Sequence, residues 1–176
     1  MRVSIIIVNW NGLEHLPDCL ASLKRQSFRD FEVVLVDNGS TDGSLAYLRA
    51  EHPWVELVEL PENRGFAGGN NAGLAKARGE LIVTLNNDTE AEPSFLSELV
   101  AVADRHPQAG MVGARILNYF RPERVDSLGL AFCRDAMSRG DYRGRDFREL
   151  SLEPVQEILI PSACVALYRR RMLEEI

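Results

Sequence analysis

Short apolar runs rich in β-branched residues alternate with segments of helical periodicity along the first two-thirds of the chain. Strands are predicted at residues 3–8, 32–36, 55–60, 81–85 and 111–117. Helices are predicted at residues 13–26, from a cap at Ser40 or Thr41 to about residue 51, at 66–78 and at 93–106. Such alternation is typical of a mostly parallel sheet with helices on both faces. We therefore predict an α/β fold whose right-handed crossovers bring the ends of several strands to one edge.

Length and charge exclude several classes of protein. The chain has 176 residues, which predicts one domain or slightly more, and its net charge of -6 argues against a nucleic-acid binder. No apolar run approaches the roughly 18 residues that a membrane helix needs. The segment 1–8 is read as the first strand, because it is too short for the core of a signal peptide. We predict a cytoplasmic protein with at most peripheral contact at the inner face of a membrane.

The three cysteines and the histidines show no metal-binding spacing. Cys19, Cys133 and Cys164 lie far apart and outside any Cys-x-x-Cys pattern, so we expect core or surface thiols. His52 and His106 each precede a proline and are predicted to lie at helix ends.

The last third of the chain differs in character. Residues 118–150 are polar and rich in arginine, with charges of both signs. One interpretation is a solvated, mobile loop. The alternative is an active-site flap whose arginines face a phosphate. Residues 155–161 and 164–168 are then predicted as strands, and a helix starts at residue 169.

Two polar segments follow predicted buried strands. They are residues 36–42, which include Asp37, and residues 85–89, which include Asp88. Ligands of open α/β sheets bind in the crevice beyond the strand ends. Asp37 could accept a hydrogen bond from an imide N–H or a ribose hydroxyl, or it could only organise its turn. Asp88 could hold a divalent ion that bridges a diphosphate, or it could cap the next helix.

A third segment, residues 62–73, combines four glycines with Arg64 and the pair Asn70 and Asn71. It matches neither Gly-x-Gly-x-x-Gly nor a P-loop, so a dinucleotide site of the Rossmann type is not expected. Close packing of the helix against the sheet would explain the glycines equally well. The arginine and the asparagines are better explained by a ligand nearby.

Four segments together resemble the family 2 glycosyltransferases, and most closely the rhamnosyltransferase-like branch. The segments occur in the family's order and are residues 4–11 (SIIIVNWN), 36–42 (VDNGSTD), 63–71 (NRGFAGGNN) and 85–89 (LNNDT). The resemblance is close over about the first hundred residues and looser beyond them.

This resemblance implies a GT-A fold, inversion at the anomeric carbon, a sugar donor carried by UDP or dTDP, and Mg²⁺ or Mn²⁺ as cofactor. Asp88 would bind the metal. The acceptor would be a cell-surface polysaccharide or a lipid-linked glycan. Many relatives carry a second Asp where this chain has Asn86 or Asn87, which would weaken metal binding. The residues expected to hold the nucleotide are Val8, Asn9, Trp10, Asp37, Asn63, Arg64, Asn71 and Asn87.

The same resemblance divides the chain. Residues 1–117 would bind the donor, and residues 118–176 would form a flexible loop and the start of the acceptor side. In the family, the catalytic base lies in an acidic stretch after the counterpart of residues 161–170, and here it would lie beyond Ile176. We therefore expect a truncated chain that binds donor, transfers little sugar and self-associates through uncovered apolar surface.

Two other functions remain open at this point. One is a non-catalytic module that binds nucleotide sugars. The other is a sugar-nucleotide pyrophosphorylase, which uses a similar sheet. That enzyme would be expected to carry a Gly-rich, Arg-containing loop after the first strand, where this chain has residues 9–12 (NWNG).

Overall fold

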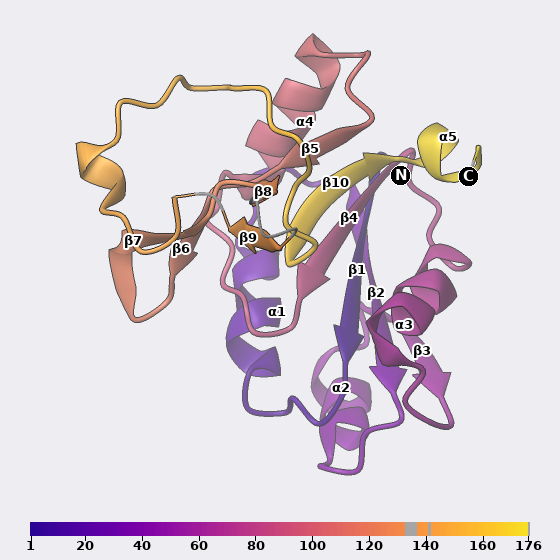
Figure 1. Cartoon of the computed structure of the whole chain (residues 1–176). Helices are drawn as coiled ribbons and strands as arrows, with labels where there is room; N and C mark the ends of the chain where they lie inside the picture. Colours follow the sequence, from indigo (N-terminus) through magenta and orange to yellow (C-terminus); the bar gives the residue numbers. More distant parts are fainter. Residues whose placement is uncertain (133–136, 141, 176) are drawn as a thin grey trace.

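The computed structural model describes residues 1–132, 137–140 and 142–175. Within them, six strands form a main sheet in the order β3-β2-β1-β4-β10-β5 (Figure 1). The first four of these strands are parallel, and β10 is antiparallel to both β4 and β5. The predicted α/β fold with a mostly parallel sheet is therefore confirmed. The strands are β1 (Val3–Asn9), β2 (Phe31–Asn38), β3 (Glu56–Leu60), β4 (Leu81–Asn86), β5 (Met111–Gly113) and β10 (Val165–Arg169).

Helices cover both faces of this sheet. The larger apolar cluster joins one face of the strands to α1 (Leu16–Lys24), α2 (Ser44–Glu51) and α4 (Phe95–Arg105). The smaller cluster lies on the opposite face, where α3 (Gly65–Leu74) packs on β1 and β2. Alternate residues of β1 serve the two faces, so Ile5 and Ile7 join the first cluster and Ile6 joins the second.

Two glycines of α3 explain how closely this helix approaches the sheet. A Cβ atom on Gly69 would lie 2.6 Å from Val8 Cγ1, and one on Gly73 would lie 2.5 Å from Ile6 Cγ2. Any larger side chain would force the helix away from the strands. At these two positions the packing explanation of the glycine-rich segment is therefore confirmed.

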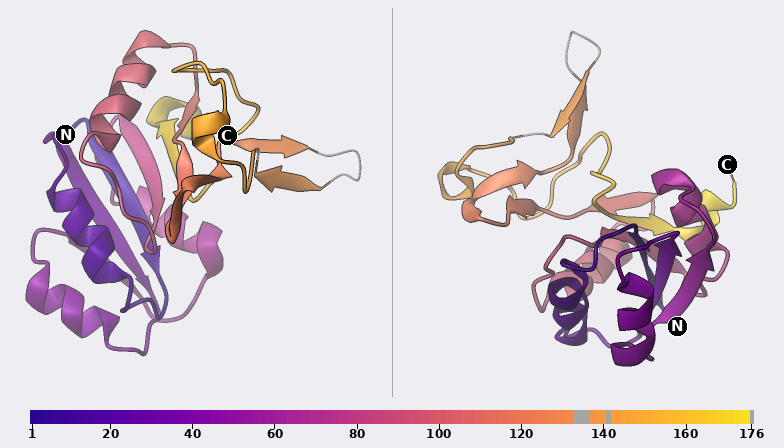
Figure 2. Two further views of the ribbon diagram at one scale, coloured as in Figure 1. Left: turned by 90° about the vertical axis from the view of Figure 1, so that its left-hand side faces the viewer. Right: turned by 90° about the horizontal axis from the view of Figure 1, so that it is seen from below.

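The chain between β5 and β10 leaves the main sheet and projects from one side of it (Figures 1 and 2). It forms two hairpins and a short 3₁₀ helix. The elements are β6 (Ile116–Asn118), β7 (Arg121–Ser127), β8 (Leu130–Phe132), β9 (Ser138–Gly140) and η1 (Phe147–Glu149). The described parts of residues 118–150 therefore contain regular structure where a loop was predicted, while the mobility of this segment and its alternative role as an active-site flap stay predictions; residues 133–136 and 141 lie outside the description.

Two strand predictions also need correction. The strand predicted at 111–117 is split into β5, which pairs with β10 in the main sheet, and β6, which pairs with β7 in the projecting region. Residues 155–161 do not form a strand, and only an isolated bridge joins Ile160 to Leu130. Pairing with the main sheet is taken by β10, which follows this segment.

Arginines fix β10 in place. The guanidinium of Arg169 donates hydrogen bonds to the carbonyl oxygens of Ala109 at 2.8 Å, Ala103 at 2.5 Å and His106 at 3.1 Å, around the end of α4. Arg170, the first residue of α5 (Arg170–Leu173), donates to the carbonyl oxygens of Ala77 and Gly79 after α3. Cations suit these positions, because the last carbonyls of a helix lack partners and carry partial negative charge.

No helix in the described part of the chain combines the length and the apolar content that crossing a membrane requires.

Candidate functional site

The C-terminal ends of β1, β2 and β4 meet at one edge of the main sheet. Asn9 at the end of β1 is in register with Asp37 on β2, and Val8 is in register with Asn86 on β4. The two polar segments predicted to lie at strand ends therefore flank the end of β1. We call the polar groups gathered here the strand-end site.

Asn9 joins the two flanking segments. Its side chain is fully buried. Its amide nitrogen lies 3.4 Å from Asp37 Oδ1 and 3.3 Å from Ser40 Oγ, and its Oδ1 accepts a 2.7 Å hydrogen bond from Asn87 Nδ2. A Cβ atom at Gly12 would lie 2.1 Å from Asn87 Nδ2, so a larger residue there would displace the Asn87 amide from Asn9. The side chain of Asn9 thus connects Asp37 with Asn87, and all three residues were predicted from the sequence as nucleotide-binding.

Asp37 is only 2% exposed and takes part in its own turn. Its Oδ2 accepts a 3.1 Å hydrogen bond from the backbone N–H of Ser40. This is the contact expected if the residue organises the turn. An ionised carboxylate offers about four acceptor positions, so two donors leave it able to accept a further one.

The turn after β2 is joined to the turn after β1. Asn11, with a left-handed φ of 51°, accepts a 2.7 Å hydrogen bond from the N–H of Thr41. Asp42 accepts from the N–H groups of Ser44 at 3.0 Å and Leu13 at 2.9 Å. Burial would raise the pKa of Asp42, but these bonds and that from the Ser44 hydroxyl outweigh burial and lower it. The predicted cap at Ser40 or Thr41 is wrong, because Asp42 binds the first N–H of α2.

Asn38 is a residue of this site that sequence reasoning missed. It is buried at the end of β2, and its amide nitrogen donates to Asn63 Oδ1 at 3.0 Å. Its Oδ1 accepts from the N–H of Arg64 at 2.9 Å. The start of α3 is thereby tied to the strand that carries Asp37. The available signal was an amide directly after Asp37 at the end of an apolar strand, because a buried polar side chain needs nearby partners.

The other predicted residues differ in their placement. Trp10 is 56% exposed just after β1, whereas Val8 packs beneath Gly69 of α3. The guanidinium of Arg64 is exposed and has no hydrogen-bonded or charged partner among the described residues. Asn71 is exposed on α3 and makes no side-chain hydrogen bond to the network in the part of the chain described.

Asp88 is exposed in the turn that follows β4. It does not cap α4, whose N-cap position is taken by Ser94. No three His, Cys, Asp or Glu side chains among the described residues are placed so that they could hold a metal ion together, so the protein alone offers no complete cage for a metal there. A hard divalent ion held by one carboxylate, with phosphate and water as its other ligands, fits this arrangement.

The cysteines near this turn are not nucleophiles. Burial raises the pKa of Cys19 to about 12, and its Sγ lies 3.8 Å from the carbonyl oxygen of Asn86. Burial also raises the pKa of Cys164 to about 11, and the charges of Asp88 and Asp126 add to this effect. Both thiols are therefore protonated at neutral pH, as expected for structural cysteines. Cys133 lies outside the described residues.

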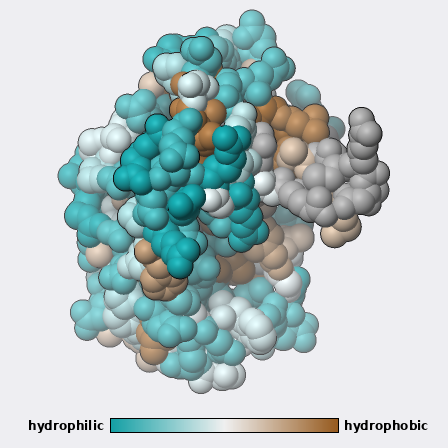
Figure 3. Space-filling model, turned by 60° about the vertical axis from the view of Figure 1, so that its left-hand side comes forward, coloured by the Kyte–Doolittle hydropathy of each residue, from teal (hydrophilic) through white to brown (hydrophobic). Residues whose placement is uncertain are grey.

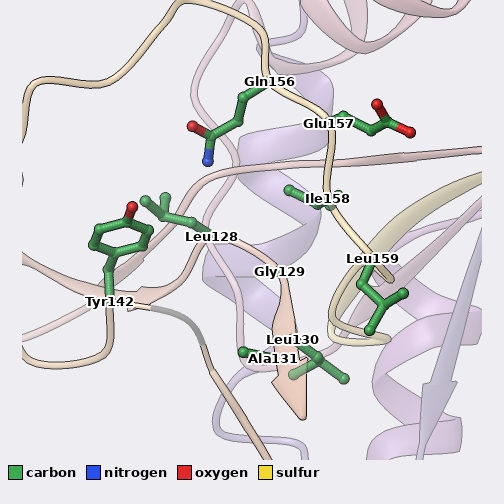
Figure 4. A pocket seen from close by; sticks show the side chains of 9 residues that line it. All are labelled: Leu128, Gly129, Leu130, Ala131, Tyr142, Gln156, Glu157, Ile158 and Leu159. Carbon is green, nitrogen blue, oxygen red and sulfur yellow. The ribbon is translucent and has the colours of Figure 1, made fainter.

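A cavity of about 400 Å³ lies in the projecting region, away from the strand-end site. Figure 4 shows Tyr142 and Gln156 on one side of it, with the carboxylate of Glu157 turned away from them. No lysine or arginine lines it, so it lacks the cationic groups that would hold a diphosphate. The lining residues are Leu128, Gly129, Leu130, Ala131, Tyr142, Gln156, Glu157, Ile158 and Leu159.

Comparisons with known proteins agree on one family. The family model described as "Glycosyl transferase family 2" matches residues 4–176. An uncharacterized glycosyltransferase, alr2836 of Nostoc sp., is 27% identical over 179 residues, which is 100% of this chain and 53% of that protein. The chain thus spans about half the length of this curated relative.

Two solved structures show the same fold. TarS 1-349 of S. aureus, in complex with UDP-GlcNAc, matches 99% of this chain and 47% of its own with a TM-score of 0.70 and 23% identity. The mannosyltransferase PcManGT of Pyrobaculum calidifontis, in complex with GDP-Man and Mn²⁺, matches 99% of this chain and 46% of its own with a TM-score of 0.69 and 24% identity. Both likenesses identify the predicted GT-A fold.

Proposed function

The chain belongs to glycosyl transferase family 2, and we propose that it forms the donor-binding part of an inverting transferase that uses a pyrimidine nucleotide sugar. The observation that carries this proposal is the network of Asn9, Asp37 and Asn87 beside the exposed carboxylate of Asp88. It combines a polar nucleoside pocket with a charged group suited to a metal-bound diphosphate, both at the edge where α/β sheets bind ligands.

In this proposal the base binds between the ends of β1 and β2. The backbone from Val8 to Trp10 and the Asp37 carboxylate hold a uracil or thymine, whose N3–H donates to the carboxylate. Asn63 and Arg64 line the nucleoside pocket, and the Arg64 guanidinium is available because no described residue pairs with it. Asn71 lies further along α3 and would contact the donor only at the periphery.

Asp88 would hold Mg²⁺ or Mn²⁺ through its carboxylate. When bound, such an ion neutralises negative charge on the departing diphosphate. The amides of Asn86 and Asn87 add no charge, so we expect the ion to bind weakly until a diphosphate is present. The Asn87 amide is already used by Asn9, which ties the metal-binding turn to the nucleoside pocket.

Sugar transfer also needs a carboxylate that takes the proton of the acceptor hydroxyl as that oxygen attacks the anomeric carbon. We assign this role to no residue of the chain, and the expectation that the base lies beyond Ile176 stays a prediction. The nature of the sugar, rhamnose included, and of the glycan acceptor likewise stays a prediction.

Calorimetric titration with UDP, dTDP, GDP and ADP in the presence of Mn²⁺ tests the proposal. We expect UDP or dTDP to bind more tightly than either purine nucleotide, because neutral purines lack a matching imide in the same position. Replacing Asp37 by Asn should cost about 1.5–3 kcal/mol of UDP binding, the range for a hydrogen bond to a charged group. Equal affinity for ADP and UDP would refute the base assignment.

Because Asp37 is buried, its replacement tests folding as well as binding. A second variant is therefore needed at an exposed residue of the proposed pocket. Arg64→Ala removes an exposed side chain, so it should weaken UDP binding without lowering the melting temperature. Arg49→Ala is the control, since Arg49 pairs with Glu59 at 2.7 Å on the exposed surface of α2 and β3. If both arginine variants bind UDP like the wild type, Arg64 is not part of the nucleoside pocket.

A further inference from the structure

The hairpin formed by β6 and β7 displays two aromatic side chains at its turn. Tyr119 is 58% exposed and Phe120 is 87% exposed, and their rings pack edge to face with centroids 5.3 Å apart. The turn itself is held in shape, because Asn118 Oδ1 accepts hydrogen bonds from the N–H groups of Phe120 at 3.1 Å and Arg121 at 2.9 Å. The aromatic pair is thus presented to solvent by a defined turn.

A cleft of about 280 Å³ lies directly beside this turn. It contains three arginines and one carboxylate. Asp126 pairs with Arg143 at 3.1 Å, and Arg124 donates to the carbonyl oxygen of Gly144 at 3.2 Å. The guanidinium of Arg121 has no such partner among the described residues. The lining residues are Asn118, Arg121, Arg124, Val125, Asp126, Arg143 and Gly144.

The chemistry of this cleft favours phosphate. The net charge of the whole chain is -6, whereas residues 118–150 hold seven arginines, no lysine and six carboxylates, so this segment is slightly basic and its cations are all guanidinium groups. Guanidinium groups present planar forks of N–H donors that match phosphate oxygens, whereas ammonium groups act as point charges. Arg143 pairs with Asp126 and Arg124 lies 3.9 Å from the carboxylate of Glu123, so among the described residues the guanidinium of Arg121 supplies the positive charge left for an anionic ligand.

We propose that the β6–β7 hairpin docks on an anionic bilayer surface. Tyr119 and Phe120 would lie at the level of the headgroups, where aromatic rings of proteins gather at membranes. The arginines of the cleft would bind lipid phosphates, and Arg121 would contribute most because it has no partner to lose. In Figure 1 the turn of the hairpin points to the same side as the C-terminal ends of β1, β2 and β4.

The geometry of the molecule is compatible with such contact. The hairpin stands out from the main sheet in Figure 1 and in the right-hand view of Figure 2. Figure 3 views this side and shows small apolar patches bounded by hydrophilic side chains rather than one broad apolar face. A surface of this kind suits shallow binding at headgroup depth. The proposal does not depend on the nucleotide specificity of the strand-end site.

Flotation of the whole chain with vesicles tests the proposal. We expect binding to phosphatidylcholine vesicles that contain phosphatidylglycerol, little binding to phosphatidylcholine alone, and weaker binding at high salt because the attraction is screened. Arg121→Glu should reduce binding at least fivefold, on the scale of about fivefold per basic residue at an anionic surface. Phe120→Ser should also reduce binding several-fold.

The matched controls lie outside the hairpin and its cleft. Arg105→Glu makes the same charge change in the last turn of α4, which contacts β5, and Trp54→Ser removes an exposed aromatic ring just before β3, at the opposite edge of the main sheet. Neither should change vesicle binding. Melting temperatures and UDP binding of all four variants show that the fold and the donor site are intact.

Three outcomes would overturn the proposal. The first is equal binding to vesicles with and without phosphatidylglycerol. The second is an equal loss for Arg105→Glu and Arg121→Glu, which would reflect net charge alone. The third is loss with Arg121→Glu but none with Phe120→Ser, together with calorimetric binding of free glycerol 3-phosphate. That result would make the cleft a site for soluble phosphates instead of a membrane contact.

Discussion

The strand-end site and the projecting region both carry many polar side chains, but they hold them differently. At the strand-end site, Asn9, Asp37 and Asn38 are nearly inaccessible to solvent and bond to one another or to the backbone of adjacent turns. In the projecting region the carboxylate of Asp146 is buried, but the ion pair of Arg143 with Asp126 lies in water, where the side chain of Arg143 is 71% exposed. The first arrangement fixes geometry, and the second leaves charge available to a partner.

The energetic consequences differ in the same way. A buried polar group that loses its partner costs about 1–3 kcal/mol, because nothing replaces the lost hydrogen bond. An exposed ion pair contributes only about 0–1 kcal/mol, because water competes for both charges. Stability should therefore depend on the sheet and the groups anchoring it, with little contribution from the projecting ion pairs.

The largest loss of stability is expected when β10 is released from its anchor. Arg169→Met removes three hydrogen bonds to the carbonyls around the end of α4 and should cost about 3 kcal/mol in the free energy of unfolding. Arg171→Met is the control, because the exposed side chain of Arg171 donates a single hydrogen bond within the described part of the chain, to the carbonyl oxygen of Pro107 at 2.9 Å. Urea denaturation of both variants measures the difference. Equal losses would show that Arg169 does not anchor the strand.

A smaller loss is expected where α3 meets the sheet. Gly73→Ala should cost about 1–3 kcal/mol, because the new methyl group would lie 2.5 Å from Ile6 Cγ2 and force the helix outward. The higher helix propensity of alanine, worth about 1 kcal/mol, offsets only part of this cost. Ala67→Val adds bulk on the exposed side of the same helix and should change stability by less than about 1 kcal/mol. A stabilised Gly73→Ala variant would disprove the close contact.

The smallest loss of stability is expected for an exposed ion pair of the projecting region. Arg143→Gln breaks the exposed pair with Asp126 and should change the free energy of unfolding by at most about 1 kcal/mol. The change should shrink further when salt is added, because exposed charges are screened. Denaturation at low and high ionic strength measures it. A loss as large as that of Arg169→Met would mean that the projecting region also carries the stability of the fold.

The sequence was most informative where local pattern decides structure. Runs such as residues 3–8 and 81–85 are apolar and β-branched, and polar residues end both of them, so the parallel strands and their shared edge could be predicted. The contacts of Asn38 could not be predicted, because its partners Asn63 and Arg64 lie after another helix and another strand. Such pairings depend on the tertiary fold.

The projecting region was harder to predict for a physical reason. The turn between β6 and β7 has Tyr119 and Phe120 at its centre, without the glycine or asparagine that usually marks a tight hairpin. Residues 164–168 could be recognised as a strand, but its place between β4 and β5 depends on the bonds that Arg169 makes to carbonyls far away in sequence. Every residue has a backbone carbonyl group, so the sequence does not indicate which of them accept the hydrogen bonds of Arg169.

The central claim is that Asp88 connects a nucleoside pocket to a metal-bound diphosphate. Calorimetry of UDP and uridine, each with and without Mn²⁺, tests it in the wild type, in Asp88→Asn and in the control Glu90→Gln, whose exposed carboxylate pairs with Arg25 nearby. We predict that Mn²⁺ strengthens UDP binding at least tenfold in the wild type and in Glu90→Gln. It should have no effect in Asp88→Asn, and uridine should bind equally in all three. An effect of Mn²⁺ that survives in Asp88→Asn, or is absent from the wild type, would contradict the account.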